Sequence, residues 1–339
     1  MNKKILVIQT AFLGDVILSL PMVQMLKKIM PEGSIDYLCI PHTAQVLQNN
    51  PYLRNVITYD KHRRGARDFL KTVSRIKGER YDIVICPHRS YRSALLTHLS
   101  QAKVRIGFDI NPFSWLLTEV VLYDPHLHEI QREMELIKGF EFLKRDVSFK
   151  PELFPSESDK EVVEKLLKLV NSKVIAFAPC SKWFTKQIPE TKARELTYDM
   201  IGLGFKVVLI GGKEDTEYCN ELKNDIPDER LVNFCGRLTP LQSSYLIGKV
   251  SLLVTTDSAA MHLGAATDTP IAVVYGSTVP SLGFYPLTSR HMIMENTGLE
   301  CRPCTDHGRR NCPLEHFKCM IEIEAKDVAG AVRELIISD

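Results

Sequence analysis

A glycine and an aspartate follow the apolar run of residues 4–9, in a position where they could support catalysis. Gly14 has no side chain, so the backbone there could approach a ligand closely. Asp15 begins the next amphipathic stretch, where an aspartate can cap a helix and stabilise it by about 0.5–2 kcal/mol. The same carboxylate could act as a general base that accepts a proton from an attacking hydroxyl group. The residue types leave both interpretations of Asp15 open.

A second polar turn, residues 255–262, follows the apolar residues 251–254. A strand, a polar turn and a helix in this order expose backbone N–H groups, which can bind phosphate groups. Ser258 adds a hydroxyl group to the turn. Asp257 or Ser258 could equally cap the helix, with His262 one turn further on. The turn therefore predicts either a helix cap or an anion-binding site.

Two lysines lie in the loop that follows the apolar residues 174–178. Lys182 and Lys186 could neutralise a diphosphate, or both could be solvated surface residues. A further loop begins with two glycines at 211–212, which allow a tight turn between a strand and a helix. The acidic residue Glu214 could hold a ribose hydroxyl group or complement the positive end of the helix.

Basic residues of the N-terminal half gather at residues 61–67 and 87–92. They form either a solvated face or a binding site for an anionic acceptor. Few aromatic residues lie among them, which disfavours single-stranded nucleic acid as a ligand. The formal net charge of +2 also argues against a protein that coats nucleic acid. The arginines concerned are Arg63, Arg64, Arg67, Arg89 and Arg92.

Four of the nine cysteines cluster near the C-terminus, at Cys301, Cys304, Cys312 and Cys319. Four thiols at this spacing could hold a structural zinc ion, although only the first pair has the C-x2-C spacing that is usual for zinc. Free thiols and disulfides are the alternatives, and a reducing compartment disfavours disulfides.

These loops are positioned by alternating strands and helices, the pattern that predicts α/β domains with parallel sheets. The pattern restarts after a proline-containing linker at 145–159. We therefore predict two Rossmann-like domains that face each other across a cleft, with ligands beyond the carboxyl ends of the strands. The predicted strands are 4–9, 34–40, 81–86, 103–106, 120–122, 174–178, 205–210, the region of 232, 251–255 and 270–275. The predicted helices are 15–30, 90–100, 129–143, 159–170, 190–203, 214–224, 239–248, 258–266 and 324–337.

The composition is that of an ordinary folded protein. Hydrophobic residues make up 45% and charged residues 25% of the 339 residues, which excludes a mostly disordered or fibrous chain. No apolar run approaches the roughly 20 residues that a membrane-spanning helix needs. We expect a cytoplasmic protein for which contact with a membrane surface is possible.

Several motifs together resemble one family. The opening ILVIQTAFLGDVILSLPMVQMLKK resembles the N-terminus of the lipopolysaccharide heptosyltransferases, which use ADP-heptose, and within them the heptosyltransferase II branch. The segment TTDSAAMHLGAA is similar to their donor loop, D-S/T-G-x-x-H. YGSTVPSLGFYPL is similar to their next loop, and CRPCTDHGRRNCPLEHFKCM to a cysteine-bearing segment of many relatives. The resemblance runs along essentially the whole chain, in order.

The resemblance implies a glycosyltransferase of the GT-B type and an inverting, metal-independent reaction that needs no cofactor. It implies an acceptor-binding domain at 1–150, a nucleotide-sugar-binding domain at 151–325, and a C-terminal helix at 326–339 that packs back on the first domain. Asp15 would deprotonate the acceptor hydroxyl group for in-line attack on the anomeric carbon. Lys186, in preference to Lys182, would stabilise the departing diphosphate.

The resemblance also assigns residues to the donor. Gly14 would let the loop approach the donor, Ser181 would bind a phosphate group, and Glu214, or else Glu217, would bind the ribose. The donor loop would contribute Asp257, Ser258, Ala259 and His262. Ala259 departs from the usual glycine, and an alanine would be strained there if the position requires a positive φ.

The implied acceptor is the inner core of lipopolysaccharide, whose negative charge would suit Arg63, Arg64, Arg89 and Arg92. We expect a monomer at the inner face of the cytoplasmic membrane. The alternatives are transfer of another sugar on the same fold, a nucleotide-sugar epimerase or hydrolase, and a non-catalytic module that binds nucleotide sugars.

Overall fold

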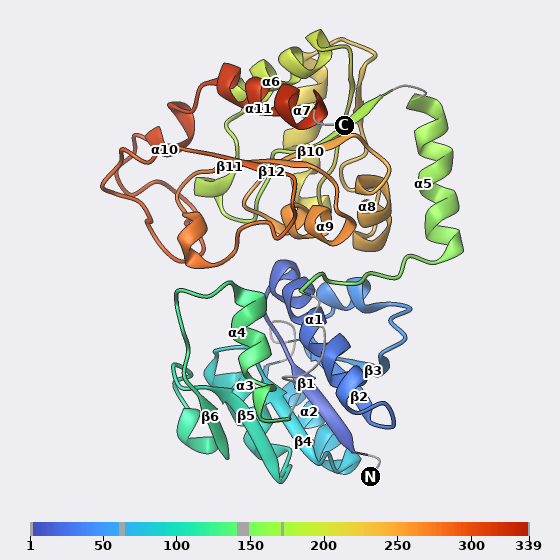
Figure 1. The fold of residues 1–339 in the computed structure, drawn as a ribbon, viewed down its shortest axis with the longest axis vertical. Helices are drawn as coiled ribbons and strands as arrows, with labels where there is room; N and C mark the ends of the chain where they lie inside the picture. The colour runs from blue at the N-terminus through green and yellow to red at the C-terminus, as the bar shows by residue number, and fades with distance from the viewer. Residues whose placement is uncertain (1–2, 61–64, 141–148, 171–172, 338–339) are drawn as a thin grey trace. The chain divides into compact units, whose positions relative to one another are not determined.

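The computed structural model describes residues 3–60, 65–140, 149–170 and 173–337. The chain divides into two compact units, Met1–Phe154 and Pro155–Asp339, close to the boundary expected after residue 150. Each unit contains one six-stranded parallel sheet with helices packed on it (Figure 1).

The sheet of the first unit has the strand order β3-β2-β1-β4-β5-β6. The chain builds one side of the sheet outward from β1 and then returns to the other side of β1 with β4. The carboxyl ends of β1 and β4 therefore flank the point where the strand order reverses, which is where such sheets bind ligands. The strands are β1 (Lys4–Ile8), β2 (Ser34–Cys39), β3 (Leu53–Thr58), β4 (Ile83–Cys86), β5 (Val104–Phe108) and β6 (Glu119–Val121).

The helices of the first unit include one that is buried along most of its length. α1 begins directly after the loop that follows β1, and its residues 16–26 are all buried. α4 packs against α1, which brings two segments far apart in the sequence together. The helices are α1 (Leu13–Ile29), α2 (Gly65–Glu79), α3 (Tyr91–Leu99) and α4 (Glu129–Glu135), with short 3-10 turns at Thr43–Leu47, Ser114–Leu116 and Lys138–Phe140.

The sheet of the second unit repeats this topology, with the order β12-β11-β10-β7-β8-β9. The strand order here reverses between β10 and β7, so the loops after these two strands occupy the ligand-binding position of the sheet. The central strands β7, β10 and β11 are buried throughout, as their continuous apolar sequences predict. The strands are β7 (Val174–Ala178), β8 (Lys206–Leu209), β9 (Leu231–Asn233), β10 (Leu252–Thr256), β11 (Ile271–Tyr275) and β12 (His291–Glu295).

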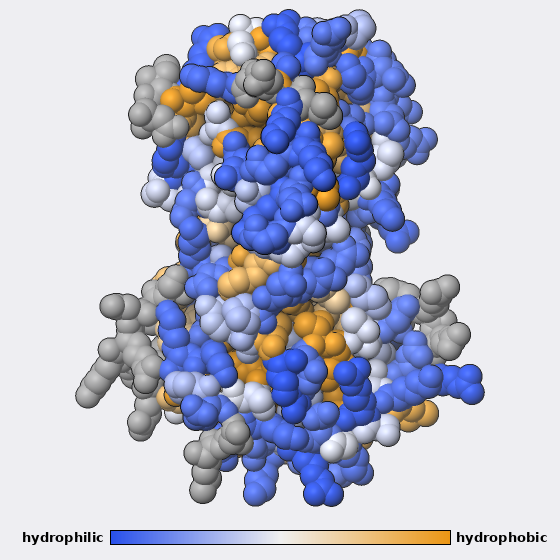
Figure 2. Space-filling view, turned by 90° about the vertical axis from the view of Figure 1, so that its right-hand side faces the viewer, coloured by the Kyte–Doolittle hydropathy of each residue, from blue (hydrophilic) through white to orange (hydrophobic). Residues whose placement is uncertain are grey.

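The helices of the second unit include the last helix of the chain. They are α5 (Glu157–Val170), α6 (Glu190–Gly202), α7 (Thr216–Asp225), α8 (Pro240–Ile247), α9 (Ala259–Thr267), α10 (Lys318–Ile321) and α11 (Ala325–Ile337), with 3-10 turns at Phe184–Lys186, Lys213–Asp215 and Pro280–Leu282. None of the described helices is both long and apolar enough to cross a membrane. Hydrophilic residues cover most of the face that carries α5 (Figure 2).

The C-terminal helix packs within the second unit. α11 contacts α6 and β11, and Val328, Val332 and Leu335 are buried in the core of this unit. These residues are spaced i, i+4, i+7 and so form one apolar face of the helix. The expectation that residues 326–339 pack back toward the first domain stays a prediction, since these contacts describe only the packing of α11 within its own unit.

Four of the described strands and helices were not expected from the sequence, and one predicted helix is shorter than expected. β3, α2, β12 and α10 are present in addition to the predicted elements. The helix expected at 129–143 ends at Glu135 and is followed by the 3-10 turn Lys138–Phe140, and residues 141–143 lie outside the described residues.

Candidate active site

Asp15 lies in the first turn of α1, directly after the loop from β1. Its Oδ2 accepts a hydrogen bond from the backbone N–H of Phe12 at 3.2 Å. Asp15 is thus not the N-cap residue, which is Phe12, but its carboxylate caps the helix by accepting this N–H from the third position. It also lies at the point where the strand order of the first sheet reverses, so the capping role and a catalytic role are compatible at this position.

The surroundings of Asp15 favour its protonated form. The pKa of Asp15 is raised from 3.8 to about 6, mainly by burial and next by the negative charge of Glu129. The positive charge of Arg89 and the hydrogen bond from the Phe12 N–H act in the opposite direction. A carboxylate with a pKa near 6 is ionised at neutral pH and is a stronger base than an ordinary aspartate.

The charges beside Asp15 come from α4 and from the loop after β4. Glu129 and Arg132 are both buried, and their side chains form an ion pair at 2.8 Å. Arg132 also donates hydrogen bonds to the backbone carbonyls of Asp124 and Pro125, at 2.8 and 2.6 Å. Arg89 lies 3.8 Å from the other oxygen of Glu129. The sequence analysis did not single out Glu129 or Arg132.

A network of hydroxyl groups and a histidine follows β1 and β4. The side chain of Thr10 lies 2.8 Å from Nδ1 of His88 and 3.1 Å from the hydroxyl group of Ser93. Ser90 caps α3 by accepting a hydrogen bond from the Ser93 N–H at 3.2 Å. These polar contacts fix the two loops that meet where the strand order reverses.

Two of the four predicted acceptor arginines lie in the described residues. The guanidinium group of Arg89 stacks over the ring of Tyr123, 4.7 Å from its centre. Arg92 is exposed and lies over the ring of Tyr91, which is its neighbour on α3. The structure therefore brings Arg89, but not Arg92, into the charged group around Asp15. Arg63 and Arg64 lie outside the described residues.

In the second unit, Lys186 pairs with a carboxylate from the neighbouring loop. Its Nζ lies 2.8 Å from Oδ2 of Asp257, and both side chains are largely buried. The hydroxyl group of Thr278 donates a hydrogen bond to the same oxygen at 2.7 Å, and the hydroxyl group of Thr256 donates to the backbone carbonyl of Lys186. The loops after β7, β10 and β11 thus meet at this one ion pair.

Lys182 has different surroundings. Its side chain is exposed, its Nζ lies 5.9 Å from the centre of the Trp183 ring, and desolvation lowers its pKa while the charge of Glu214 raises it. The structure thus distinguishes the two lysines and places Lys186 beside the predicted donor loop.

The N-terminus of α9 carries the remaining residues of that loop. Ser258 is the N-cap residue with extended backbone, and its hydroxyl group lies 3.4 Å from that of Thr255. Ala259 is the first residue of the helix and is not among the residues with positive φ. The strain considered for an alanine at this position therefore does not arise. His262 is buried one turn further along the helix.

Ser181 and Glu214 follow the neighbouring strands β7 and β8. The Ser181 hydroxyl group accepts a hydrogen bond from the Trp183 N–H at 3.4 Å. Glu214 is exposed in the 3-10 turn that precedes α7, as is the alternative Glu217 within α7. The carboxylate that caps this turn is that of Asp215, whose Oδ2 accepts a hydrogen bond from the Gly212 N–H at 2.8 Å.

The loop after β11 contributes residues that the sequence analysis did not name. Ser277 and Thr278 are buried, and the Ser277 hydroxyl group lies 2.8 Å from that of Thr185. Arg302 donates hydrogen bonds to the backbone carbonyls of Gly276 and Thr278, at 2.5 and 2.7 Å. The motif YGSTVPSLGFYPL indicated this loop, but the residue types within it did not by themselves predict a chemical role for any one side chain.

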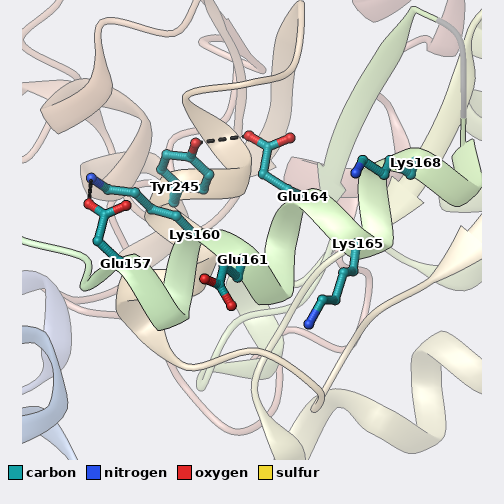
Figure 3. A pocket seen from close by; sticks show the side chains of 7 residues that line it. All are labelled: Glu157, Lys160, Glu161, Glu164, Lys165, Lys168 and Tyr245. Atoms are coloured by element: carbon teal, nitrogen blue, oxygen red, sulfur yellow. Dashed lines mark hydrogen bonds and ion pairs between the residues drawn. The ribbon is translucent and has the colours of Figure 1, made fainter.

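A surface hollow of about 290 Å³ beside α5 is separate from these residues (Figure 3). Within it, the hydroxyl group of Tyr245 donates a hydrogen bond to Glu164 at 2.9 Å, and Lys160 pairs with Glu157 at 2.6 Å. Glutamates and lysines spaced along an exposed helix face are typical of a solvated surface, so this hollow is not a candidate active site.

The comparisons with known proteins identify the family of the chain. The family model of glycosyltransferase family 9 (heptosyltransferase) matches residues 69–315. The chain belongs to glycosyltransferase family 9. It is therefore a glycosyltransferase, as the sequence motifs predicted.

Individual members of the family match this glycosyltransferase along most of its length. Lipopolysaccharide heptosyltransferase 2 of Salmonella typhimurium is 27% identical, over 82% of this chain and 84% of that protein. A solved family 9 glycosyltransferase from Veillonella parvula superposes with a TM-score of 0.85 at 20% identity, over 100% of this chain and 99% of that one. The ADP-heptose lipopolysaccharide heptosyltransferase II of Escherichia coli superposes with a TM-score of 0.82 at 24% identity, over 99% of both chains. The predicted GT-B architecture of two Rossmann-like domains is confirmed.

The four C-terminal cysteines of this glycosyltransferase are not arranged as metal ligands. All nine cysteines are free thiols, so the disulfide alternative is not what the structure contains. Among the described residues, no three His, Cys, Asp or Glu side chains come together in a way that could hold a metal ion. The Cys304 thiol donates to the Cys301 carbonyl at 3.2 Å, and burial raises the pKa of Cys319 to about 11. These observations favour the free-thiol alternative.

Proposed function

We propose that this family 9 enzyme transfers a heptose from ADP-heptose to the inner core of lipopolysaccharide, with inversion and without a catalytic metal ion. The observation that carries the proposal is the buried Lys186–Asp257 pair beside the N-terminus of α9, in the segment that resembles the donor loop. A relative of known structure is named for ADP-heptose and lipopolysaccharide, and a curated relative for the same acceptor.

The donor half of the proposal rests on the second unit. The first N–H groups of α9 have no carbonyl partner within the helix and carry part of the positive end of its dipole, which suits a diphosphate. Lys186, whose ammonium group is paired with Asp257, adds a charged hydrogen-bond donor beside them. As ADP departs, negative charge grows on its terminal phosphate group, and these preformed donors stabilise it. Ser181 would contact a phosphate group, and Glu214 the ribose.

The acceptor half rests on the first unit. Asp15 accepts the proton of the acceptor hydroxyl group while that oxygen forms its bond to the anomeric carbon. The bond from the anomeric carbon to the phosphate oxygen breaks at the opposite side, and its electron pair leaves with ADP. Attack opposite the leaving group inverts the anomeric centre, and a single carboxylate base is sufficient for it. Arg89 supplies positive charge for an anionic acceptor.

The acceptor would also determine where the enzyme works. Lipopolysaccharide core is built on a membrane-bound lipid, so we propose a cytoplasmic monomer that contacts the inner face of the cytoplasmic membrane. Arg63, Arg64 and Arg92 would add positive charge for the anionic acceptor. Co-sedimentation with vesicles of heptose-deficient lipopolysaccharide at low and high salt tests this placement, and equal recovery in the supernatant with and without vesicles would contradict it.

The direct test is ADP release from ADP-heptose in the presence of EDTA, with and without heptose-deficient lipopolysaccharide core. Release that depends on the acceptor, and that EDTA does not diminish, is expected. Release without acceptor would replace the proposal with a hydrolase or epimerase activity. Binding of ADP-heptose without any release would indicate another acceptor, another sugar or a non-catalytic binding module, and a panel of nucleotide sugars would then follow.

A further inference from the structure

Helix α4 buries two carboxyl groups next to the proposed base. Glu129 and Glu133 lie one turn apart on α4, and both are at most 2% exposed. Burying a carboxylate is costly unless it is paired or hydrogen-bonded, so such groups usually have a defined role. α4 packs against α1, the helix that carries Asp15. The negative charge of Glu129 raises the pKa of both Asp15 and Glu133, as expected for groups that lie close together.

Glu129 is held between two arginines. One carboxylate oxygen pairs with the buried guanidinium group of Arg132 at 2.8 Å, and the other faces Nη2 of Arg89 at 3.8 Å. Arg132 is fixed by its two backbone carbonyl partners, whereas Arg89 is 30% exposed and rests on the ring of Tyr123. Arg89 is therefore the arginine whose position Glu129 can determine.

Arg89 is also the cation that most affects Asp15. Among the described residues it pairs with Glu129 and forms no ion pair with Asp15. A carboxylate paired directly with an arginine has its pKa lowered by about 1–3 units and becomes a weak base. Two charged side chains in the described part of the chain change the pKa of Asp15: Glu129 from α4 and Arg89 from the loop after β4. The charge of Asp15 in turn raises the pKa of Glu133 from α4 and of Tyr37 from β2.

We propose that Glu129 is a positioning residue for the base: it holds the guanidinium group of Arg89 away from Asp15, so that Asp15 stays an effective proton acceptor. The inference rests on the proposed role of Asp15. An anionic acceptor that binds Arg89 would also help to keep the guanidinium group away from Asp15. Without Glu129, Arg89 would be free to pair with Asp15, whose pKa its charge already lowers, and the base would be neutralised by the group that should bind the substrate.

The first test measures the titration of Asp15 without any substrate. The enzyme is labelled with 13C at the aspartate side-chain carboxyl carbons, and Asp15 is assigned from the signal lost in Asp15→Asn. In Glu129→Gln, which can still accept a hydrogen bond from Arg132, the titration midpoint should fall by about 1–3 pH units. Glu135→Gln, on the same helix and paired with Lys138 at 2.9 Å, should leave the midpoint unchanged. An unchanged midpoint in Glu129→Gln would overturn the proposal.

Two further variants separate the restraint of Arg89 from the direct effect of the Glu129 charge. Arg89→Gln is compared in both backgrounds, because the charge of Arg89 already lowers the pKa of Asp15 in the parent. Its removal should raise the midpoint more in Glu129→Gln than in the parent, since only without Glu129 does Arg89 pair with Asp15. An equal rise in both backgrounds would assign the effect to the Glu129 charge alone and overturn the restraint. If Glu129→Gln does not fold, Glu129→Asp replaces it: the shorter side chain withdraws from Arg89 and should give a smaller downward shift, and no shift would count against the proposal.

The pH profile of heptose transfer then links this titration to the reaction. The acid limb of kcat/KM, which reports the pKa of the free enzyme, should move to lower pH in Glu129→Gln together with the midpoint of Asp15, and the plateau rate should fall because a weaker base accepts the proton. If the enzyme transferred heptose to no acceptor, the proposed function would be refuted. The titration of Asp15 would still show whether Glu129 restrains Arg89. A shifted midpoint with an unmoved acid limb would contradict the role of Glu129 in catalysis.

Discussion

Asp15 is the residue whose chemistry can be tested most directly. If it is the base, kcat/KM should rise with pH through about 6, the pKa of Asp15. Asp15→Asn should lower kcat by about 10²–10⁴-fold and abolish that rise, because the amide cannot accept the proton. Rate profiles of both proteins between pH 4.5 and pH 8.5 (about four units centred near that pKa) check this. An asparagine variant near the parental rate would remove Asp15 from the mechanism.

The stability of the same variant separates catalysis from a purely structural role. The folded-state pKa of Asp15, about 6, lies above its ordinary value of 3.8. A raised pKa means that the carboxyl group contributes stability below the unfolded-state pKa and that this contribution is lost as pH rises through 6. Asp15→Asn should therefore gain stability relative to the parent between pH 5 and about pH 7. Thermal melts of the variant and the parent at these two pH values test this. If Asp15→Asn were destabilised by the same amount at each, the carboxylate would have only a structural, helix-capping role.

The two lysines of the loop after β7 should behave differently. Lys186 is 12% exposed and paired with Asp257, whereas Lys182 is exposed. Loss of a charged donor aimed at the departing group costs about 10²–10³-fold in kcat, so Lys186→Ala should show a loss of that order and Lys182→Ala a much smaller one. Steady-state assays of ADP release compare them. Similar losses in the two variants would reverse the assignment of Lys186.

At the scale of elements, α4 should make stability depend on pH through its second acid. Burial, followed by the charges of Glu129 and Asp15, raises the pKa of Glu133 well above its ordinary value. Such a group stabilises the fold below its unfolded-state pKa and loses that contribution as pH rises. Glu133→Gln resembles the protonated acid, so its melting temperature relative to the parent should increase from acidic to mildly alkaline pH. A difference that is constant with pH would mean that Glu133 is ionised in the fold.

The helix α9 offers a test of the one departure from the family's donor loop. Ala259 has ordinary helical backbone, so the glycine of relatives is not required here for its conformational freedom. Ala259→Gly should lower the free energy of unfolding by up to about 1 kcal/mol, the intrinsic difference between these residues in a helix. It should leave the KM for the donor unchanged. A lower KM would show that a side chain at this position obstructs the donor.

The sequence predicts elements well where their apolar pattern is continuous. β1, β7, β10 and β11 are buried on both faces and were recognisable from unbroken apolar runs. β3 has an exposed, mixed pattern, LRNVIT, at the edge of the sheet and gave no comparable signal. α2 did carry a signal, since Phe69, Val73 and Ile76 recur at helical spacing, and it was overlooked beside the basic run at its start.

The candidate site was predictable to the extent that its residues follow strands. Asp15, Lys186 and Asp257 each lie at a strand's carboxyl end, and the family motifs mark the same positions. Glu129 and Glu133 could not be found in this way, because charged residues on a short helix are usually exposed. Their burial results from the packing of α4 on α1, a contact between segments more than 100 residues apart.

For the whole molecule, each unit has its own hydrophobic core, and the chain's last helix belongs to the second one. Leu335 is 7% exposed within that core, so Leu335→Ala should destabilise the second unit by about 2–5 kcal/mol. Amide hydrogen exchange followed by mass spectrometry should then show faster exchange in peptides from α6 and β11, while peptides from β1 and β4 stay protected as in the parent. Exposed Arg333 on the same helix supplies the control variant, Arg333→Ala, which should change neither set. Faster exchange in β1 and β4 would instead support packing of α11 on the first domain, the arrangement that the family resemblance implied.

The same variant should also bind nucleotide less well. α11 contacts β11, and the loop after β11 carries Thr278, which donates a hydrogen bond to Asp257. If α11 packs less firmly, this hydrogen bond should weaken, and added ADP should slow the amide exchange of Leu335→Ala less than it slows that of the parent.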